Sequence, residues 1–285
     1  KAYFLIYVTV TVKVKIDNIE IDTELSPIII KGERKYSLVR LYYYLIKTFY
    51  LLPRLYGIKV DDPLLGWKNE FERQFKQILS NELSLAKLYY NSNFEIETRK
   101  FTVLGQINAE SVSVEVKLKE IPQLDDRGIR GLMKVDSFYF SDLEKKRPYI
   151  IPAIRSGLIA SFYRFLPFQF EGAPGIPKTL GLISEFINSM LLPQGYKEEI
   201  LGHKIYVKEN DLYCDEDIIY NADPEILSIF PIVFYLKNSS ENNIVIIEEP
   251  EAHLTDKGIN YVRNLLNSSK AKIVIASDYF SNNTI

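Results

Sequence analysis

Two adjacent carboxylates, Glu248 and Glu249, come directly after an apolar run of the sequence, Ile244–Ile247, and directly before Pro250. Four β-prone apolar residues that end in acids are typical of a buried parallel strand, which delivers its last side chains to the carboxyl edge of the sheet. In a site that hydrolyses a nucleotide, Glu248 would hold a magnesium ion through water and Glu249 would polarise the attacking water. The alternative is a strand that merely ends in solvated acids, but the flanking residues IVII and PEAHL make this string too specific for that.

The string EEPEAHL, followed by an expected helix and by the strand IVIASDYF, resembles the OLD and RecF-like branch of the ABC-type ATPases. The segment Tyr149–Arg164, YIIPAIRSGLIASFYR, is similar to a segment that those proteins carry ahead of their signature lobe. The resemblance implies an α/β fold with a P-loop NTPase-like mixed sheet (an ABC-type ATPase head), an antiparallel β lobe and a helical insertion. It also implies ATP and Mg2+ as ligands, and a nucleotide-gated homodimer or hetero-oligomer formed through the signature face. Many members of the branch act in DNA repair or phage defence. His253 matches a position common in the branch, although a side chain at a loop-to-helix junction explains it equally well.

The loop that binds phosphates in this family should follow the strand Pro27–Ile30 as G-x-x-x-x-G-K-S/T, because several glycines let backbone N–H groups face the phosphates. The chain has GERKYS instead. The resemblance implies Gly32, Lys35, Ser37 and Glu248 as nucleotide-binding residues, Ser37 and Glu248 as magnesium ligands, and Glu249 as the catalytic residue. However, the loop is about three residues shorter than the pattern and lacks its second glycine. Either the loop has degenerated, or the sequence lacks residues at this place.

Two further elements of the family pattern are altered. The signature segment, which contacts the γ-phosphate of the partner subunit, reads NADPE, so Asp223 and Glu225 would present negative charge to phosphate. Asp223 and Pro224 nevertheless favour a helix start, as an N-cap followed by proline in the first turn. The last strand ends in Ala276, where the family has a switch histidine. ATP hydrolysis is therefore expected only if the phosphate loop is complete. The alternative is an inactive pseudo-ATPase that acts as a structural or regulatory subunit.

The periodicity of apolar residues predicts the elements that position these side chains. Strands are expected over Tyr3–Ile16, Ile19–Ile21, Pro27–Ile30, Phe94–Glu120 as a hairpin, Tyr149–Ala153, KIYV paired with DIIY after residue 203, Ile244–Ile247 and Lys272–Ala276. Helices are expected over Ser37–Leu52, Leu65–Tyr90, a segment that ends at Phe165, Thr179–Leu192, Ile226–Leu236 and Thr255–Leu266, with a loop rich in Gly and Pro over Pro167–Pro177. We expect a single ABC-type head over residues 1–285, with a core lobe of about 1–56 and 201–285 and an insertion of about 57–200.

The composition limits the partners of the chain. Its 285 residues include 47% hydrophobic side chains, two histidines and a single cysteine, Cys214. One cysteine excludes an internal disulfide and cannot complete a conventional zinc site, which favours a reducing, cytoplasmic setting. The net charge of -2 gives no general attraction to a polyanion, so nucleic acid would need a local basic patch. No segment is long and apolar enough to span a membrane, and no membrane partner is expected.

Overall fold

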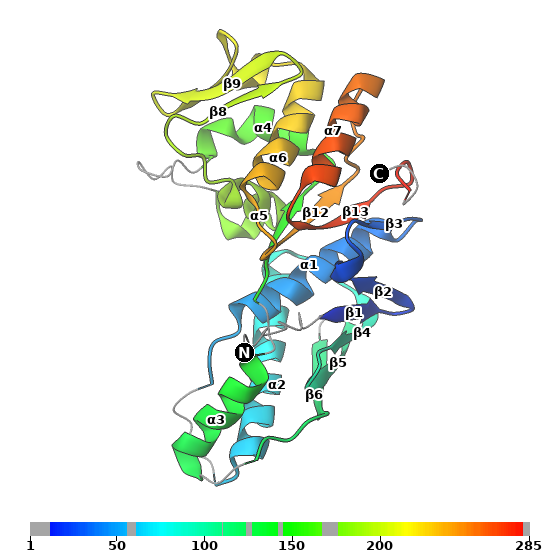
Figure 1. Cartoon of the computed structure of the whole chain (residues 1–285), viewed down its shortest axis with the longest axis vertical. Helices are drawn as coiled ribbons and strands as arrows, with labels where there is room; N and C mark the ends of the chain where they lie inside the picture. Colours follow the sequence, from blue (N-terminus) through cyan, green and yellow to red (C-terminus); the bar gives the residue numbers. More distant parts are fainter. Residues whose placement is uncertain are drawn as a thin grey trace, which may run out of the picture. The chain divides into compact units, whose positions relative to one another are not determined.

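A computed structural model of the chain describes residues 12–55, 61–109, 111–123, 127–141, 145–166 and 176–281. The chain divides into two compact units, each built from segments that are far apart in the sequence (Figure 1). Unit 1 comprises Lys1–Glu24, Thr48–Asn81 and Tyr89–Lys145, and unit 2 comprises Leu25–Lys47, Glu82–Leu88 and Lys146–Ile285. The first part of the expected strand Tyr3–Ile16 and most of the expected loop Pro167–Pro177 lie outside the described residues. No described helix is both long enough and apolar enough to cross a membrane.

Unit 1 is built on a five-stranded antiparallel sheet in the order β2-β1-β4-β5-β6. Its strands are β1 Lys13–Ile16, β2 Ile19–Asp22, β4 Asn91–Glu97, β5 Phe101–Asn108 and β6 Ser111–Leu118. Its helices are α2, Pro63–Leu85, most of which lies in this unit, and α3, Gly128–Phe140. The buried rings of Trp67 and Phe71, one helical turn apart on α2, pack against Phe101 of the sheet, and the ring of Tyr139 from α3 stacks on Trp67. This aromatic cluster forms much of the core of unit 1.

Unit 2 contains a four-stranded sheet in the order β3-β13-β12-β7, in which all pairings are parallel. Its strands are β3 Ile28–Ile30, β7 Arg147–Ile151, β12 Asn243–Glu248 and β13 Lys272–Ala276. Its helices are α4 Arg155–Phe162, α5 Leu182–Ser189, α6 Pro224–Asn238 and α7 Asp256–Ser268, and α1 Lys35–Leu51 begins in this unit. The central strands β12 and β13 are buried over nearly their whole length, which is the expected state of apolar strands inside a parallel sheet.

The α/β class is confirmed, and the strands predicted at Pro27–Ile30, Ile244–Ile247 and Lys272–Ala276 are neighbours in one sheet. The expectation of a mixed sheet is wrong for the described strands, because those of the core sheet are all parallel and the antiparallel strands form two separate sheets. The boundaries of the compact units also differ from the expected lobes. Residues 146–200 belong to unit 2, because β7 pairs with β12 and α5 packs against β7.

A second sheet of unit 2 is antiparallel, in the order β11-β10-β9-β8. Its strands are β8 Lys197–Ile200, β9 His203–Lys208, β10 Asp211–Cys214 and β11 Asp217–Ile218. The expected pairing of KIYV with DIIY is wrong, since β9 pairs with β8 and β10, whereas DIIY begins as β11 and pairs with β10. The reason is the two-residue turn at Glu209 and Asn210, whose positive φ angles of 52° and 64° connect β9 directly to β10.

Two helices are shorter than their apolar patterns predict. α2 stops at Leu85 because Lys87 adopts a positive φ of 52°, and the N–H of Leu88 returns to the carbonyl of Leu83 at 3.0 Å. α5 begins only at Leu182, after a short 3-10 turn, because Gly181 breaks the helix with a φ of +58°. A Cβ at Gly181 would lie 3.1 Å from a backbone oxygen, so the close approach also requires glycine.

Candidate functional site

The carboxyl ends of β3, β13 and β12 bring the predicted site residues together. Glu248 is in register with Ala276, and Ala276 is in register with Ile30, so these three residues form one row across the sheet. The chain leaves this edge at Glu249 and, after β3, at the turn containing Gly32. The acidic pair and this turn are therefore neighbours, as the sequence predicts.

Arg40 neutralises the first acid of the pair. The Glu248 side chain is fully buried, and its carboxylate accepts hydrogen bonds from Nε of Arg40 at 2.5 Å and from Nη2 of Arg40 at 2.9 Å. The backbone N–H of Ala153 donates a further hydrogen bond at 3.3 Å. A two-pronged guanidinium is a strong partner for a carboxylate. A cation of the protein itself thus binds the carboxylate that the sequence assigns to magnesium.

Glu249 is fixed by its backbone and by two side chains of α1. Its φ of 42° lies in the left-handed region, and its N–H donates to the carbonyl of Ala276 at 2.8 Å. Its carboxylate accepts a hydrogen bond from the Tyr36 hydroxyl, and its Oε1 lies 3.7 Å from Nζ of Lys35. Burial and the neighbouring Glu249 carboxylate raise the pKa of Tyr36 well above its ordinary value, so Tyr36 remains a neutral donor. One oxygen of the proposed catalytic carboxylate is therefore already occupied.

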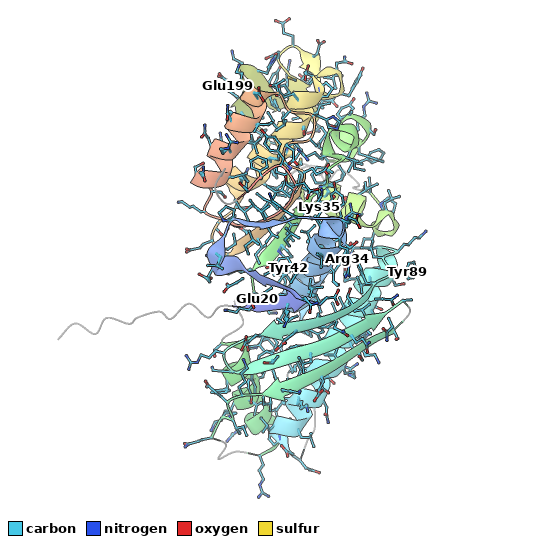
Figure 2. The ribbon with its side chains drawn as sticks, turned by 90° about the vertical axis from the view of Figure 1, so that its right-hand side faces the viewer. Glu20, Arg34, Lys35, Tyr42, Tyr89 and Glu199 are labelled. Atoms are coloured by element: carbon cyan, nitrogen blue, oxygen red, sulfur yellow. The ribbon has the colours of Figure 1, made fainter. Side chains whose placement is uncertain are left out.

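The turn between β3 and α1 consists only of residues 31–34. Gly32 adopts a φ of +92°, which favours glycine, and its N–H donates to Oδ1 of Asp278 at 2.9 Å. Lys35, which Figure 2 shows at the start of α1, donates from Nζ to Oδ2 of the same carboxylate. This hydrogen bond raises the pKa of Lys35, and the Gly32 N–H together with Lys35 lowers the pKa of Asp278. The two groups predicted to bind phosphate thus share an internal anion.

Arg155 anchors the loop that carries the acids, a role that the sequence did not reveal. Its guanidinium is fully buried and donates to the carbonyl oxygens of Ser228, Glu248, Glu249 and Pro250 at distances of 2.8 to 3.0 Å. Burial lowers the pKa of Arg155 to about 10, and the nearby glutamates oppose that shift. The signal in the sequence was an arginine inside the otherwise apolar segment YIIPAIRSGLIA. A charged side chain that is buried in such a segment needs several hydrogen-bond partners, so this arginine indicates a buried polar anchor.

The other predicted residues lie at or near the site with other contacts. Ser37 is exposed on the first turn of α1, and within the described residues no hydrogen bond joins it to Glu248. Asp223 is the N-cap of α6 and accepts the N–H of Glu225 at 2.7 Å. The Glu225 carboxylate accepts hydrogen bonds from the N–H and the hydroxyl of Thr255, the N-cap of α7, at 2.7 and 2.6 Å. The altered signature segment therefore serves to start and connect two helices.

These residues do not fit ATP with magnesium as they stand. A phosphate loop needs backbone N–H groups that point outward and are free. In this turn, the N–H of Gly32 donates to Asp278, and the N–H of Lys35 donates to the carbonyl of Gly32 at 3.1 Å. The magnesium position at Glu248 faces the guanidinium of Arg40. Nucleotide binding would have to break the ion pairs Arg40–Glu248 and Lys35–Asp278 and lengthen the turn.

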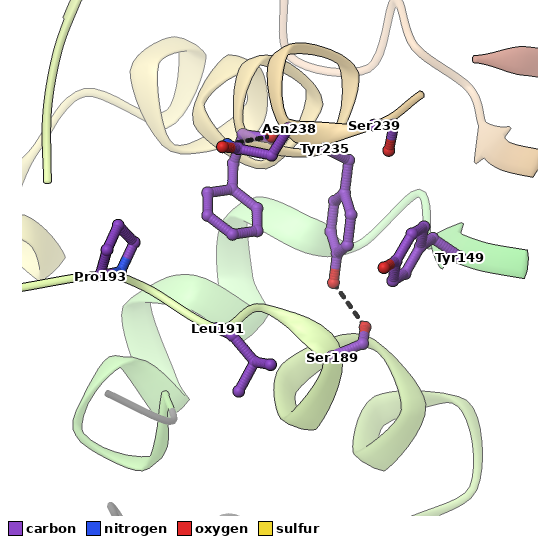
Figure 3. A pocket seen from close by; sticks show the side chains of 8 residues that line it. Tyr149, Ser189, Leu191, Pro193, Tyr235, Asn238 and Ser239 are labelled. Atoms are coloured by element: carbon purple, nitrogen blue, oxygen red, sulfur yellow. Dashed lines mark hydrogen bonds between the residues drawn. The ribbon is translucent and has the colours of Figure 1, made fainter. Parts of the chain in front are cut away.

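A separate recess in unit 2 has a volume of about 260 Å³ and is shown in Figure 3. Its aromatic walls include Tyr149 of β7 and Tyr235 of α6, whose hydroxyl is 2.6 Å from that of Ser189. Sites for drug-sized ligands usually measure about 300 to 1,000 Å³, so this recess is too small for a nucleotide. It also lies near the end of α6, which leads into the start of β12, whereas Glu248 is at the other end of that strand.

Comparison with known proteins does not assign the chain to a family. No protein-family model matches the chain, and no curated protein gives a significant match. Any function assigned to this chain therefore has to follow from its own residues and contacts.

Proposed function

We propose that this chain is an ABC-type ATPase-like head whose nucleotide site is closed by its own ion pairs, and that it acts as a structural or regulatory subunit rather than as an ATP hydrolase. The observation that carries the proposal is the pairing of the fully buried Glu248 with Arg40, next to a turn of only four residues, 31–34. A carboxylate that holds hydrated magnesium needs oxygens directed at the ion, and Arg40 uses both oxygens of Glu248.

The balance of charges supports the same proposal. ATP with magnesium is an anion and needs cations that are not already neutralised. Lys35 is paired with Asp278 and lies close to Glu249, so its charge is shared between two internal anions. Asp223 and Glu225 add negative charge at the start of α6, where a partner subunit would approach a γ-phosphate in this family. A bound phosphate would therefore face Lys35, whose charge is already neutralised, and, in a dimer, the carboxylates at the start of α6 of the partner subunit.

The competing candidate is an ATP-binding head that hydrolyses ATP in a nucleotide-gated dimer. It is favoured by the position of Lys35, whose Nζ lies 3.7 Å from Glu249 at the carboxyl edge of the sheet. In that candidate, Gly32 and Lys35 would bind phosphates, Ser37 and Glu248 would hold Mg2+, and Glu249 would polarise water. The partner would be a second copy or a related subunit, bound through the face at the start of α6. In either case, the single Cys214 favours a cytoplasmic setting, and the net charge of -2 gives no support for nucleic acid as a partner.

A turnover measurement separates the two candidates. We expect phosphate release from ATP by the wild-type chain to equal that of Glu249→Gln and to be unchanged by magnesium, because Glu249 is bound by Tyr36 and Lys35. Glu241→Gln, a matched change at an exposed loop position, controls for the loss of one negative charge. Magnesium-dependent release that Glu249→Gln abolishes and Glu241→Gln preserves would establish the ATPase and exclude the closed site.

A further inference from the structure

The antiparallel sheet of unit 2 brings together three side chains that ligate transition metals. His203 is the first residue of β9, Cys214 is the last residue of β10, and Asp215 follows it in the turn to β11. One ligand atom from each of the three lies within 4.8 Å of the other two. The three residues are close together in the fold and lie on one short stretch of chain. They are separate from the site at Glu248 and Arg40.

The backbone holds these three side chains in place. Cys214 is in register with Ile205, and His203 lies two residues before Ile205, so the imidazole and the thiol belong to the same face of the sheet. Asp215 adopts a φ of 56°, and its N–H donates to the carbonyl of Lys204 at 2.7 Å. Its Oδ1 accepts the N–H of Lys204 at 2.8 Å, which leaves Oδ2 directed at Nδ1 of His203, 2.8 Å away. The carboxylate is thus oriented by the hairpin before any ligand binds.

We propose that His203, Cys214 and Asp215 bind one divalent transition metal ion of the zinc class, with water completing the coordination. Imidazole, thiolate and carboxylate are established zinc ligands, and the thiolate with the imidazole selects against magnesium and calcium. Tetrahedral zinc with ordinary bond lengths separates such ligand atoms by roughly 3.3 to 3.6 Å, so small side-chain movements bring this cluster to that geometry. The single cysteine excludes a closed site of four Cys and His ligands but not an open site of three ligands.

The surroundings favour a cation over an anion. Asp215, Glu216 and Asp217 are consecutive and exposed, and they line the turn next to Cys214. A hydrogen-bonded pair of His203 and Asp215 alone would account for their 2.8 Å contact. It would not account for a buried thiol whose sulfur lies within 4.8 Å of ligand atoms of both residues. The same hairpin thus supplies all three ligand types, and an ion can reach the buried thiol from the side of the exposed His203 and Asp215.

Cobalt binding tests this proposal on the full chain after treatment with a chelator. Cobalt reports thiolate ligation through a charge-transfer absorption band in the near ultraviolet, and zinc competes for the same site. We expect one equivalent of Co2+ to bind with a dissociation constant of about 10 μM or tighter, with the thiolate band present, and zinc to displace it. Cys214→Ser should abolish the band, and His203→Gln and Asp215→Asn should each weaken binding by about tenfold or more.

His253→Gln is the matched control, because His253 is the only other histidine of the chain, and its variant should bind cobalt as the wild type does. The side chains of His203 and Asp215 are each 48% exposed, and asparagine tolerates a positive φ, so both variants are expected to fold, which far-ultraviolet circular dichroism verifies. The proposal is overturned if cobalt does not saturate the site at concentrations up to about 1 mM. Binding without the thiolate band overturns it equally, as does binding that His203→Gln and Asp215→Asn leave unchanged.

Discussion

Replacement of Arg155 by methionine is expected to lower the free energy of unfolding by about 4 kcal/mol. The buried guanidinium donates its four shortest hydrogen bonds to the carbonyl oxygens of Ser228, Glu248, Glu249 and Pro250. Methionine has a similar length and fills most of the space, so the expected loss comes from the four hydrogen bonds that the guanidinium makes to these carbonyls, at about 1 kcal/mol each. The carboxyl end of β12 and the loop after it should become mobile.

Urea denaturation followed by circular dichroism measures this effect. Arg164→Met serves as the matched control, because Arg164 is exposed and its guanidinium contacts the hydroxyl and ring of Tyr163. It should change the free energy of unfolding by less than about 1 kcal/mol. An Arg155→Met variant as stable as the control would show that the four carbonyls do not depend on this guanidinium.

Replacement of Arg40 by methionine is expected to cost about 3 kcal/mol, because it leaves the fully buried Glu248 carboxylate without its cation. The Arg40 side chain is 33% exposed, so water partly compensates, and the loss should fall at the lower end of the range for broken buried pairs. Glu248→Gln alone should cost less, since the amide keeps its shape and accepts a hydrogen bond from Ala153 as the carboxylate does.

A double-mutant cycle isolates the pair itself. If Arg40 and Glu248 depend on each other, the variant that carries Arg40→Met and Glu248→Gln together should be more stable than the sum of the single changes predicts, by about 1 to 2 kcal/mol. Additive effects would mean that the two side chains do not interact in solution. The pair could then not close a magnesium site.

The sequence predicted the elements of unit 2 better than their contacts. Ile244–Ile247 and Lys272–Ala276 were recognised as strands because buried parallel strands are continuous apolar runs. The helix predicted from Thr255 by its apolar periodicity is α7, and the structure shows that the Thr255 hydroxyl caps it. The parallel pairing of β7 with β12 was not predictable, because a short apolar strand carries no information about its neighbours. For that reason, the sequence placed residues 146–200 with the expected insertion, without indicating that β7 would join the core sheet of unit 2.

The sequence pointed to the candidate site, but it did not show that the charged groups of the site are paired with one another. The acids Glu248 and Glu249 were identified from the apolar strand that precedes them, and Lys35 was implied by the resemblance to the ATPase family; the structure brings Lys35 close to Glu249. Arg40 was missed because a charged residue in an apolar helix pattern is expected on the solvent side. Whether it turns to an acid on β12 depends on contacts between residues 208 positions apart, which no local pattern encodes.

The most direct test of the closed nucleotide site is isothermal titration calorimetry of the wild-type chain with ATP and magnesium, using protein whose intact mass matches the printed sequence. A matching mass verifies that the turn between β3 and α1 in the sample consists only of residues 31–34. Since Asp278 and Glu248 already bind the cations and the turn offers too few free N–H groups, we expect an affinity no tighter than about 1 mM, or roughly 4 kcal/mol. Saturable binding of magnesium and ATP at one site with micromolar affinity would contradict the account.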